Sequence, residues 1–147
     1  MKESYAKELT RNDLGITGSH QAGICVPRKD KGLIEFFPHL STKEFNPDVW
    51  IQCVDAKGKN WKMRYVYYNG KIHGVNTRNE YRITYMTKFF RVWGAAEGCS
   101  VVFTATDDPN KFFIQIEKPR NLIDNQYKGE VKDKASKVVL TAWRKVH

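Results

Sequence analysis

Two aromatic-rich stretches near the middle of the chain place the strongest constraint on its fold. Within residues 61–68, large side chains take every second position, at Trp61, Met63, Tyr65 and Tyr67. A period of two is typical of a β-strand that turns one face inward. Residues 49–55 form the other stretch, and a short polar segment that includes Gly58 separates the two. Together they predict a β-hairpin.

Shorter apolar runs predict further strands on both sides of this hairpin. They cover residues 22–26, 82–85, 99–104, 111–117 and 137–143. Only two short helices are expected, over residues 32–37 and 86–93. About seven short strands separated by turn signals predict a mainly β protein, built as an antiparallel barrel or sandwich that is closed or nearly closed.

Length and composition limit what surrounds the hairpin. The chain has 147 residues, of which 41% are hydrophobic, so it contains enough apolar side chains for one core and is not a disordered chain. The sequence contains no internal repeat and no linker rich in Pro, Gly or Ser, and we therefore expect a single domain over residues 1–147. The formal net charge of +9 at pH 7 favours a polyanionic partner.

Two features of the sequence indicate the cellular location: the absence of a long apolar segment and the spacing of the cysteines. No apolar run approaches the length of a membrane span, and the polar start of the chain lacks the apolar core of a signal peptide. Cys25, Cys53 and Cys99 are far apart and form no CxxC pair, so we expect buried, reduced thiols rather than disulfides or zinc ligands. These features predict a cytoplasmic protein with no membrane partner.

The densest polar segment, residues 76–82 and here called the second loop, carries side chains suited to reading base pairs. Arg78, Glu80 and Arg82 alternate, so they share one face of an extended segment. In the major groove Arg donates to O6 and N7 of guanine, while Glu accepts from the amino group of cytosine. Phosphates repel a carboxylate, which favours base readout over simple phosphate attraction. The alternative is an ordinary surface cluster in which Glu80 screens two arginines.

A glycine-rich segment, residues 12–23 and here called the first loop, offers another polar surface. Its glycines allow backbone amides to approach an anion closely, and Ser19, His20 and Gln21 carry donors for phosphates or base edges. The spacing matches neither of the glycine motifs that bind nucleotides, so no nucleotide cofactor is expected. The alternative is a glycine-rich turn in which His20 bonds only to its own backbone.

A nuclease is one alternative function. Asp48, Asp55 and Lys57 imitate the two carboxylates and the lysine of a compact Mg²⁺-dependent nuclease. If the strand between the aspartates is extended, however, they lie about 23 Å apart, which is too far to share a metal. The four histidines have no ligand-like spacing either, so no metal site is expected.

A barrel that binds RNA or another protein is the remaining alternative. Three tyrosines are expected to be exposed, so that their rings could stack on unpaired bases: Tyr67, Tyr68 and Tyr81. Competition between duplex DNA and single-stranded RNA separates this alternative from recognition of a duplex.

Several short motifs follow one another between residues 9 and 84. The first is the sequence N-D-L-G-I-T-G-S-H-Q-A-G of residues 12–23, followed by a short strand and Pro27. The others then follow: Phe37-Pro38, Asn46-Pro47, Tyr67-Tyr68-Asn69, Thr77-Arg78-Asn79-Glu80 and Arg82-Ile83-Thr84. In this order they resemble the N-terminal effector domain of EcoRII-like type II restriction endonucleases. The resemblance covers residues 9–84, and only the strand pattern extends it beyond residue 94.

The resemblance implies an open seven-stranded pseudobarrel with one or two short helices, the fold of plant "B-three" transcription-factor domains. In that family two arms grip the major groove of duplex DNA, and they correspond here to residues 15–23 and 76–82. The EcoRII-like branch reads a short site of the CCWGG type. Cys25, Asn76 and Tyr81 depart from the family, which has a tyrosine, a lysine and a lysine at these positions.

The function implied by the resemblance is sequence-specific binding of double-stranded DNA by a monomeric recognition domain of a restriction endonuclease. The expected DNA contacts are Ser19, His20, Gln21, Asn76, Thr77, Arg78, Asn79, Glu80, Tyr81 and Arg82. Among these, His20, Arg78, Glu80 and Arg82 are carried over from the family for base contact. No catalytic residue, cofactor or small-molecule substrate is expected here, and Mg²⁺ is expected only for a separate catalytic domain outside this chain.

Overall fold

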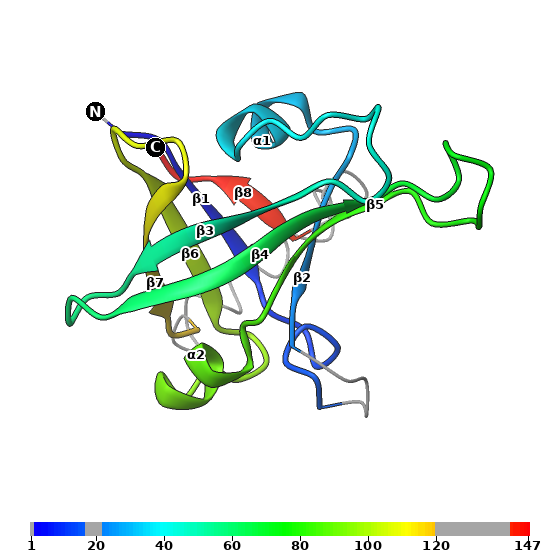
Figure 1. Ribbon diagram of the computed structural model, residues 1–147. Helices are drawn as coiled ribbons and strands as arrows, with labels where there is room; N and C mark the ends of the chain where they lie inside the picture. Colours follow the sequence, from blue (N-terminus) through cyan, green and yellow to red (C-terminus); the bar gives the residue numbers. More distant parts are fainter. Residues whose placement is uncertain (1, 17–21, 120–141) are drawn as a thin grey trace, which may run out of the picture.

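Eight strands form one sheet that curls into an open barrel (Figure 1). The computed structural model describes residues 2–16, 22–119 and 142–147. The elements in chain order are β1 (Ser4–Glu8), β2 (Ile24–Val26), α1 (Lys31–Phe36), β3 (Asp48–Val54), β4 (Asn60–Tyr68), β5 (Glu80–Thr84), α2 (Thr87–Val92), β6 (Ser100–Ala105), β7 (Lys111–Glu117) and β8 (Trp143–Lys145). The strand order is β2-β5-β4-β3-β7-β6-β1-β8, antiparallel throughout except for the parallel pair of β3 and β7. No helix within these ranges is long and apolar enough to cross a membrane.

The hairpin of β3 and β4 confirms the strand period of the two central stretches. On β4 the inward side chains of Met63 and Tyr65 are fully buried, and Tyr67 is 2% exposed. The alternate positions face outward, and two of them carry the basic side chains of Lys62 and Arg64. β4 thus divides its side chains between the core and an outer face, as expected of a strand in an antiparallel sheet.

An aromatic cluster fills the barrel next to α1. Asp30 caps this helix by accepting a hydrogen bond from the backbone amide of Leu33 at 3.1 Å. Phe37, which follows the helix, is 2% exposed. Its ring centroid lies 5.1–6.2 Å from those of Phe36, Tyr65, Phe103, Phe112 and Trp143. The end of α1 therefore directs Phe37 into the core, while α2 lies at the other end of the barrel (Figure 1).

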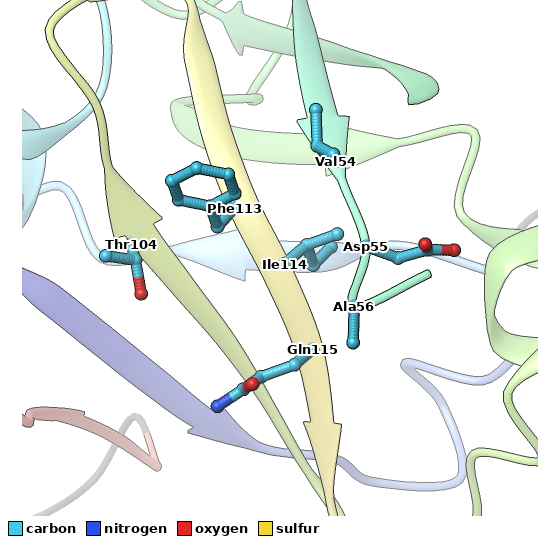
Figure 2. A pocket seen from close by; sticks show the side chains of 7 residues that line it. All are labelled: Val54, Asp55, Ala56, Thr104, Phe113, Ile114 and Gln115. Atoms are coloured by element: carbon cyan, nitrogen blue, oxygen red, sulfur yellow. The ribbon is translucent and has the colours of Figure 1, made fainter. Parts of the chain in front are cut away.

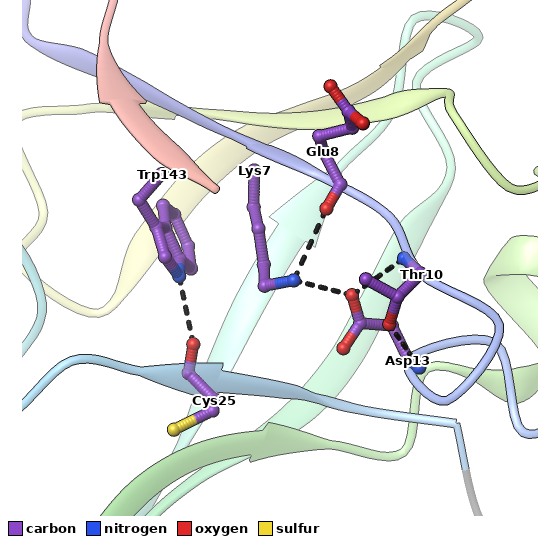
Figure 3. A network of polar contacts seen from close by, with 6 residues as sticks. All are labelled: Lys7, Glu8, Thr10, Asp13, Cys25 and Trp143. Carbon is purple, nitrogen blue, oxygen red and sulfur yellow. Dashed lines mark hydrogen bonds and ion pairs between the residues drawn. The ribbon is translucent and has the colours of Figure 1, made fainter. Parts of the chain in front are cut away.

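A side chain links the two edges of the open barrel. The edge strands of the sheet are β2 and β8, each three residues long. Trp143 of β8 donates its indole N–H to the carbonyl oxygen of Cys25 in β2 at 2.8 Å (Figure 3). In the same region Lys7 of β1 and Asp13 form a buried ion pair, with 2.5 Å between Nζ and Oδ2. These contacts join the first and last strands to the segment that contains the first loop.

The strand count differs from the sequence-based expectation, although the mainly β open barrel with two short helices agrees with it. The described residues contain eight strands rather than seven, because the sequence pattern does not predict β1. In β1 the inward positions are Tyr5 and Lys7, and the charge of Lys7 interrupts the apolar alternation. Of the strand expected over residues 137–143 only 142 and 143 are described, and Trp143 begins β8.

The cysteines are of two kinds. Cys53 and Cys99 are buried free thiols, as expected. Cys25, by contrast, is only half-buried, because it faces outward beside Arg82, whereas its neighbours on β2 are fully buried. Burial raises the pKa of the Cys25 thiol, and the nearby Glu80 carboxylate raises it further. A raised pKa disfavours the thiolate, so Cys25 is not an activated nucleophile.

Candidate nucleic-acid interface

Two long connections lie on one side of the barrel, at opposite ends of β5 (Figure 1). The connection between β1 and β2, residues 9–23, ends beside Thr84, because Ile24 pairs with Ile83. The connection between β4 and β5, residues 69–79, ends at Glu80. A strand rises about 3.3 Å per residue, so the two ends of β5 lie about 13 Å apart. The outer face of β5 and β4 forms a floor between the two connections.

Arg78 and Glu80 meet above Tyr68 at one end of this floor. An Nη2–Oε1 distance of 2.7 Å joins the guanidinium to the carboxylate. The Arg78 guanidinium carbon lies 3.7 Å from the centroid of the Tyr68 ring, which orients it by a cation–π contact. Both charged side chains remain open to solvent, at 47% and 37% exposure, and Thr77 beside them is exposed. An ordinary surface ion-pair cluster has the same features.

Arg82 lies on the same face, one step farther along β5. Its cross-strand neighbours are Cys25 and the fully buried Val66. Arg64, on the adjacent strand, pairs with Asp48 at 2.7 Å, whereas no carboxylate within the described ranges forms an ion pair with Arg82. Arg82 is therefore a half-buried cation whose donors are available to an external acceptor.

The asparagine side chains of the second loop accept hydrogen bonds from within the protein. Asn76 Oδ1 accepts a hydrogen bond from the backbone amide of Arg78 at 2.9 Å. The same side chain packs against Gly70, where any added Cβ would clash with it. Asn79 Oδ1 accepts a hydrogen bond from the Tyr67 hydroxyl. Both side chains therefore shape the connection that carries Arg78.

Tyr81 does not lie on the outer surface. Tyr67 and Tyr81 are 2% and 9% exposed, and their rings stack in the core at 4.1 Å and 5°. The expectation that these two rings are exposed is wrong, because Glu80 and Arg82 face outward and Tyr81 between them must face inward. The RNA-binding alternative thereby loses two of its three stacking rings.

The base of the β4–β5 connection is anchored by the segment that precedes β3. Asn69 is fully buried, and its amide donates to the Glu44 carbonyl oxygen at 2.8 Å. Asn46 and Asn69 exchange two hydrogen bonds between backbone amides and side-chain oxygens, at 2.8 and 3.1 Å. His73 Nε2 lies 3.2 and 3.1 Å from the carbonyl oxygens of Thr42 and Glu44, so this nitrogen carries the proton. The connection is thus attached firmly at its base.

The β1–β2 connection is anchored at both of its described ends. Asp13 accepts a hydrogen bond from the Gly23 amide at 2.9 Å, and the Ala22 amide donates to Thr87 Oγ1 at 3.1 Å. Gly23 allows close contact with β5, since an added Cβ would come within 2.7 Å of the Ile83 carbonyl oxygen. Three of the expected DNA contacts lie outside the described residues: Ser19, His20 and Gln21.

The residues of the nuclease alternative do not come together. Asp48 and Asp55 lie at the start and just beyond the end of β3, and Asp48 is paired with Arg64. Asp55 accepts four hydrogen bonds at 2.9–3.0 Å, from the indoles of Trp61 and Trp93 and from the backbone amides of Lys57 and Lys59. Both Asp55 oxygens are therefore occupied, and Asp55 has a structural role at the end of the hairpin.

The hollow beside Asp55 contains no catalytic arrangement. Its volume is about 230 Å³, and its lining consists of Val54, Asp55, Ala56, Thr104, Phe113, Ile114 and Gln115. Figure 2 shows the Asp55 carboxylate pointing away from Thr104 and Gln115. Asp55 is the titratable residue of this lining, and its carboxylate is turned away from the hollow. We therefore assign no chemistry to the hollow.

Acid is expected to destabilise the protein partly through Asp55. Burial raises the pKa of its carboxyl, but the four hydrogen bonds outweigh burial and lower the pKa from 3.8 to about 2. A group whose pKa is lower in the folded state stabilises the fold above its unfolded pKa, and this contribution disappears as the pH falls through the folded pKa. We expect Asp55→Asn to cost about 1–3 kcal/mol at neutral pH. In urea unfolding from pH 6 to 2, the difference from wild type should shrink below about pH 4. A difference independent of pH would contradict this account.

The fold is shared by solved structures, among them two from Arabidopsis. The Arabidopsis FUS3–DNA complex has a TM-score of 0.59 at 22% identity, and the match covers 78% of this chain and 96% of that chain. A hypothetical Arabidopsis thaliana protein has a TM-score of 0.53 at 15% identity, with coverage of 82% and 94%. At these identities the likeness concerns the fold, and it confirms the expected pseudobarrel.

Sequence similarity identifies the family. The type II restriction enzyme EcoRII of Escherichia coli is 39% identical over 89 residues, which cover 54% of this chain and 20% of that enzyme. This chain therefore spans about a fifth of the length of the curated relative that it matches. The family described as "Restriction endonuclease EcoRII, N-terminal" matches residues 2–111, which is most of the chain. The chain thus belongs to the family of EcoRII restriction endonuclease N-terminal domains.

Proposed function

We propose that this chain binds double-stranded DNA and reads base pairs from the major groove. The observation that carries the proposal is the outward row of Arg78, Glu80 and Arg82 between two anchored connections. The two ends of β5 lie about 13 Å apart, close to the roughly 12 Å width of the major groove of B-DNA. One duplex could therefore contact both connections and the floor between them.

Relatives and charge support a DNA partner. The curated relative is a type II restriction enzyme, and one of the solved structures with this fold is a DNA complex. The net charge of +9 favours association with any duplex. Within a longer chain, this domain would act as the recognition or effector domain of a restriction endonuclease for a short CCWGG-like site. Mg²⁺ would be needed only by a separate catalytic domain.

Each part of the surface has a separate role in this proposal. Arg78 and Arg82 donate to guanine, while Glu80 accepts from the amino group of cytosine with the oxygen that Arg78 leaves free. Asn76 and Asn79 keep the connection in shape. The second loop thus reads one half of the DNA site. The first loop contacts phosphates and the bases of the other half with its polar side chains, Ser19, His20 and Gln21.

Replacing Glu80 with alanine tests base readout directly. Removal of the acceptor should relax the preference at a G·C position by about 1–3 kcal/mol. Binding to unrelated duplexes should stay the same or tighten, because a negative charge is removed from the surface. Selection from a random duplex library at two salt concentrations, followed by titration of the selected duplex, measures both effects.

Glu117→Ala is the matched control. Glu117 also forms a surface ion pair, to Arg144 at 3.6 Å, and its side chain is 46% exposed on β7, outside the floor. This variant should bind and discriminate like the wild type. If Glu80→Ala loses affinity equally for all sequences, or behaves like Glu117→Ala, the ordinary ion-pair interpretation is correct and base readout by Glu80 is not.

A further inference from the structure

The rings of Trp50 and Tyr85 form an exposed pair on the same face as the second loop. Trp50, on β3, is 46% exposed, and Tyr85, which directly follows β5, is 50% exposed. Their ring centroids lie 4.9 Å apart with an interplanar angle of 62°. Trp50 pairs with Arg64, and Arg64 pairs with Thr84, so the register places Trp50 on the outer face. The ring pair lies at the end of β5 where the β1–β2 connection ends.

Hydrogen bonding separates Trp50 from the other tryptophans. Trp61 and Trp93 donate their indole N–H groups to Asp55, and Trp143 donates to a backbone carbonyl. The indole N–H of Trp50 and the hydroxyl of Tyr85 have no acceptor among the residues that the structure describes. Trp and Tyr are enriched at interfaces that are apolar at one end and polar at the other. The pair thus offers two apolar rings and two free donors to a partner.

Core packing does not explain Tyr85. Its φ of 65° lies in the left-handed region, which is uncommon for a bulky residue that is not glycine. In the described part of the chain, its one ring contact is with Trp50. Such strained positions are concentrated at functional sites. An exposed aromatic side chain kept in this conformation favours an external contact.

We propose that Trp50 and Tyr85 form a third DNA contact, made to the sugar–phosphate backbone at the border of the groove. This inference rests on the proposed function. When Glu80 reads a base, the ring pair lies about 13 Å farther along β5, near the edge of a groove roughly 12 Å wide, where phosphates run. Tyr hydroxyl and indole N–H groups are suitable donors to phosphate oxygens. Lys62, diagonal to Trp50 in the β3–β4 register, adds a cation.

Two conservative substitutions test the contact. Trp50→Phe and Tyr85→Phe remove one donor each and keep an aromatic ring. Each should weaken binding to a selected duplex and to a random duplex of equal length by the same factor, about two- to tenfold. The ratio of the two affinities should not change, because backbone contacts carry no sequence information. Lys62→Ala should reduce the slope of log affinity against log salt concentration by about 0.9.

Phe113→Ala is the control, since Phe113 is an equally exposed aromatic residue, 53% exposed, on the outer face of β7, which β3 separates from β4 and β5. It should bind both duplexes like the wild type, and thermal unfolding of every variant verifies folding. If the Trp50 and Tyr85 variants bind both duplexes like the wild type, or lose affinity for one sequence only, the inference is overturned. A wild-type protein that binds no duplex would instead refute the proposed function, so the two failures are distinguishable.

Discussion

Asp13→Ala should lower the free energy of unfolding by about 3–5 kcal/mol, because it leaves a buried ammonium without its counter-ion. Lys7 and Asp13 are 6% and 7% exposed. Without the carboxylate, the Glu8 carbonyl oxygen at 3.2 Å is the remaining acceptor for Lys7 in the described structure (Figure 3). Urea unfolding, followed by tryptophan fluorescence, measures the loss.

Two further variants test this explanation. Adding Lys7→Met to Asp13→Ala should restore much of the lost stability, because an apolar side chain of similar length replaces the stranded charge. Lys145→Met is the control, since Lys145 pairs with Glu3 at 3.0 Å with both side chains more than half exposed. It should leave the free energy of unfolding nearly unchanged, because an ion pair in solvent contributes little. If Asp13→Ala costs no more than this control, the buried ion pair is not important for stability.

Asp13 also connects stability to the first loop. Its carboxylate accepts a hydrogen bond from the Thr10 amide at 3.0 Å, and its carbonyl oxygen accepts one from Gly23 at 2.9 Å. Loss of the side chain should therefore loosen the β1–β2 connection before the barrel unfolds. If the chain binds DNA as proposed, Asp13→Ala should weaken this binding even at temperatures where the variant is folded.

Phe37→Ala should cost about 3–5 kcal/mol, the range found when a buried aromatic side chain is removed from a core. The Phe37 ring contacts five other rings, which come from α1 and from four different strands. Its removal creates a cavity at the point where these elements meet. Thermal and urea unfolding both measure the change.

Phe113→Ala provides the comparison for Phe37→Ala, because Phe113 is 53% exposed and lies outside the core. A change within about 0.5 kcal/mol is expected for such a surface position. Phe37→Leu, which keeps most of the volume, should cost less than Phe37→Ala. Equal losses for Phe37→Ala and Phe113→Ala would show that the ring cluster does not hold the barrel together.

The alternation of apolar and polar side chains along the sequence predicts those strands whose inward face is entirely apolar. In β4 and β7 every second side chain is large and apolar, and both strands are found where they are expected. In β1 the inward position of Lys7 reads as polar, although Asp13 neutralises it inside the barrel. A local pattern cannot predict this burial, because the ion pair forms only after the chain folds.

The same alternation explains the partial success at the candidate surface. It places Glu80 and Arg82 on the outer face, as the structure does. Applied consistently, it also places Tyr67 and Tyr81 inside, so their expected exposure is an error of interpretation rather than a missing signal.

Contacts between distant residues are not predictable from local sequence. Asn69 bonds to residues 23 and 25 positions earlier, and Asp55 bonds to Trp93, 38 positions later. Neither the turn signal at Asn69-Gly70 nor the acidic residue after β3 indicates these partners. The sequence predicts that the second loop is polar, but not that a neighbouring segment holds its base.

The hydrogen bond from Trp143 to Cys25 also affects the tendency of separate copies of the chain to associate through their sheet edges. An open sheet normally presents unpaired backbone groups at its edges, and these invite the addition of a foreign strand. Here both edge strands are three residues long, and an indole donor occupies one carbonyl oxygen between them. Such an edge is a poor template for intermolecular strand pairing. The two connections could therefore be replaced by loops of other amino-acid sequence, and the barrel would still resist aggregation through its sheet edges.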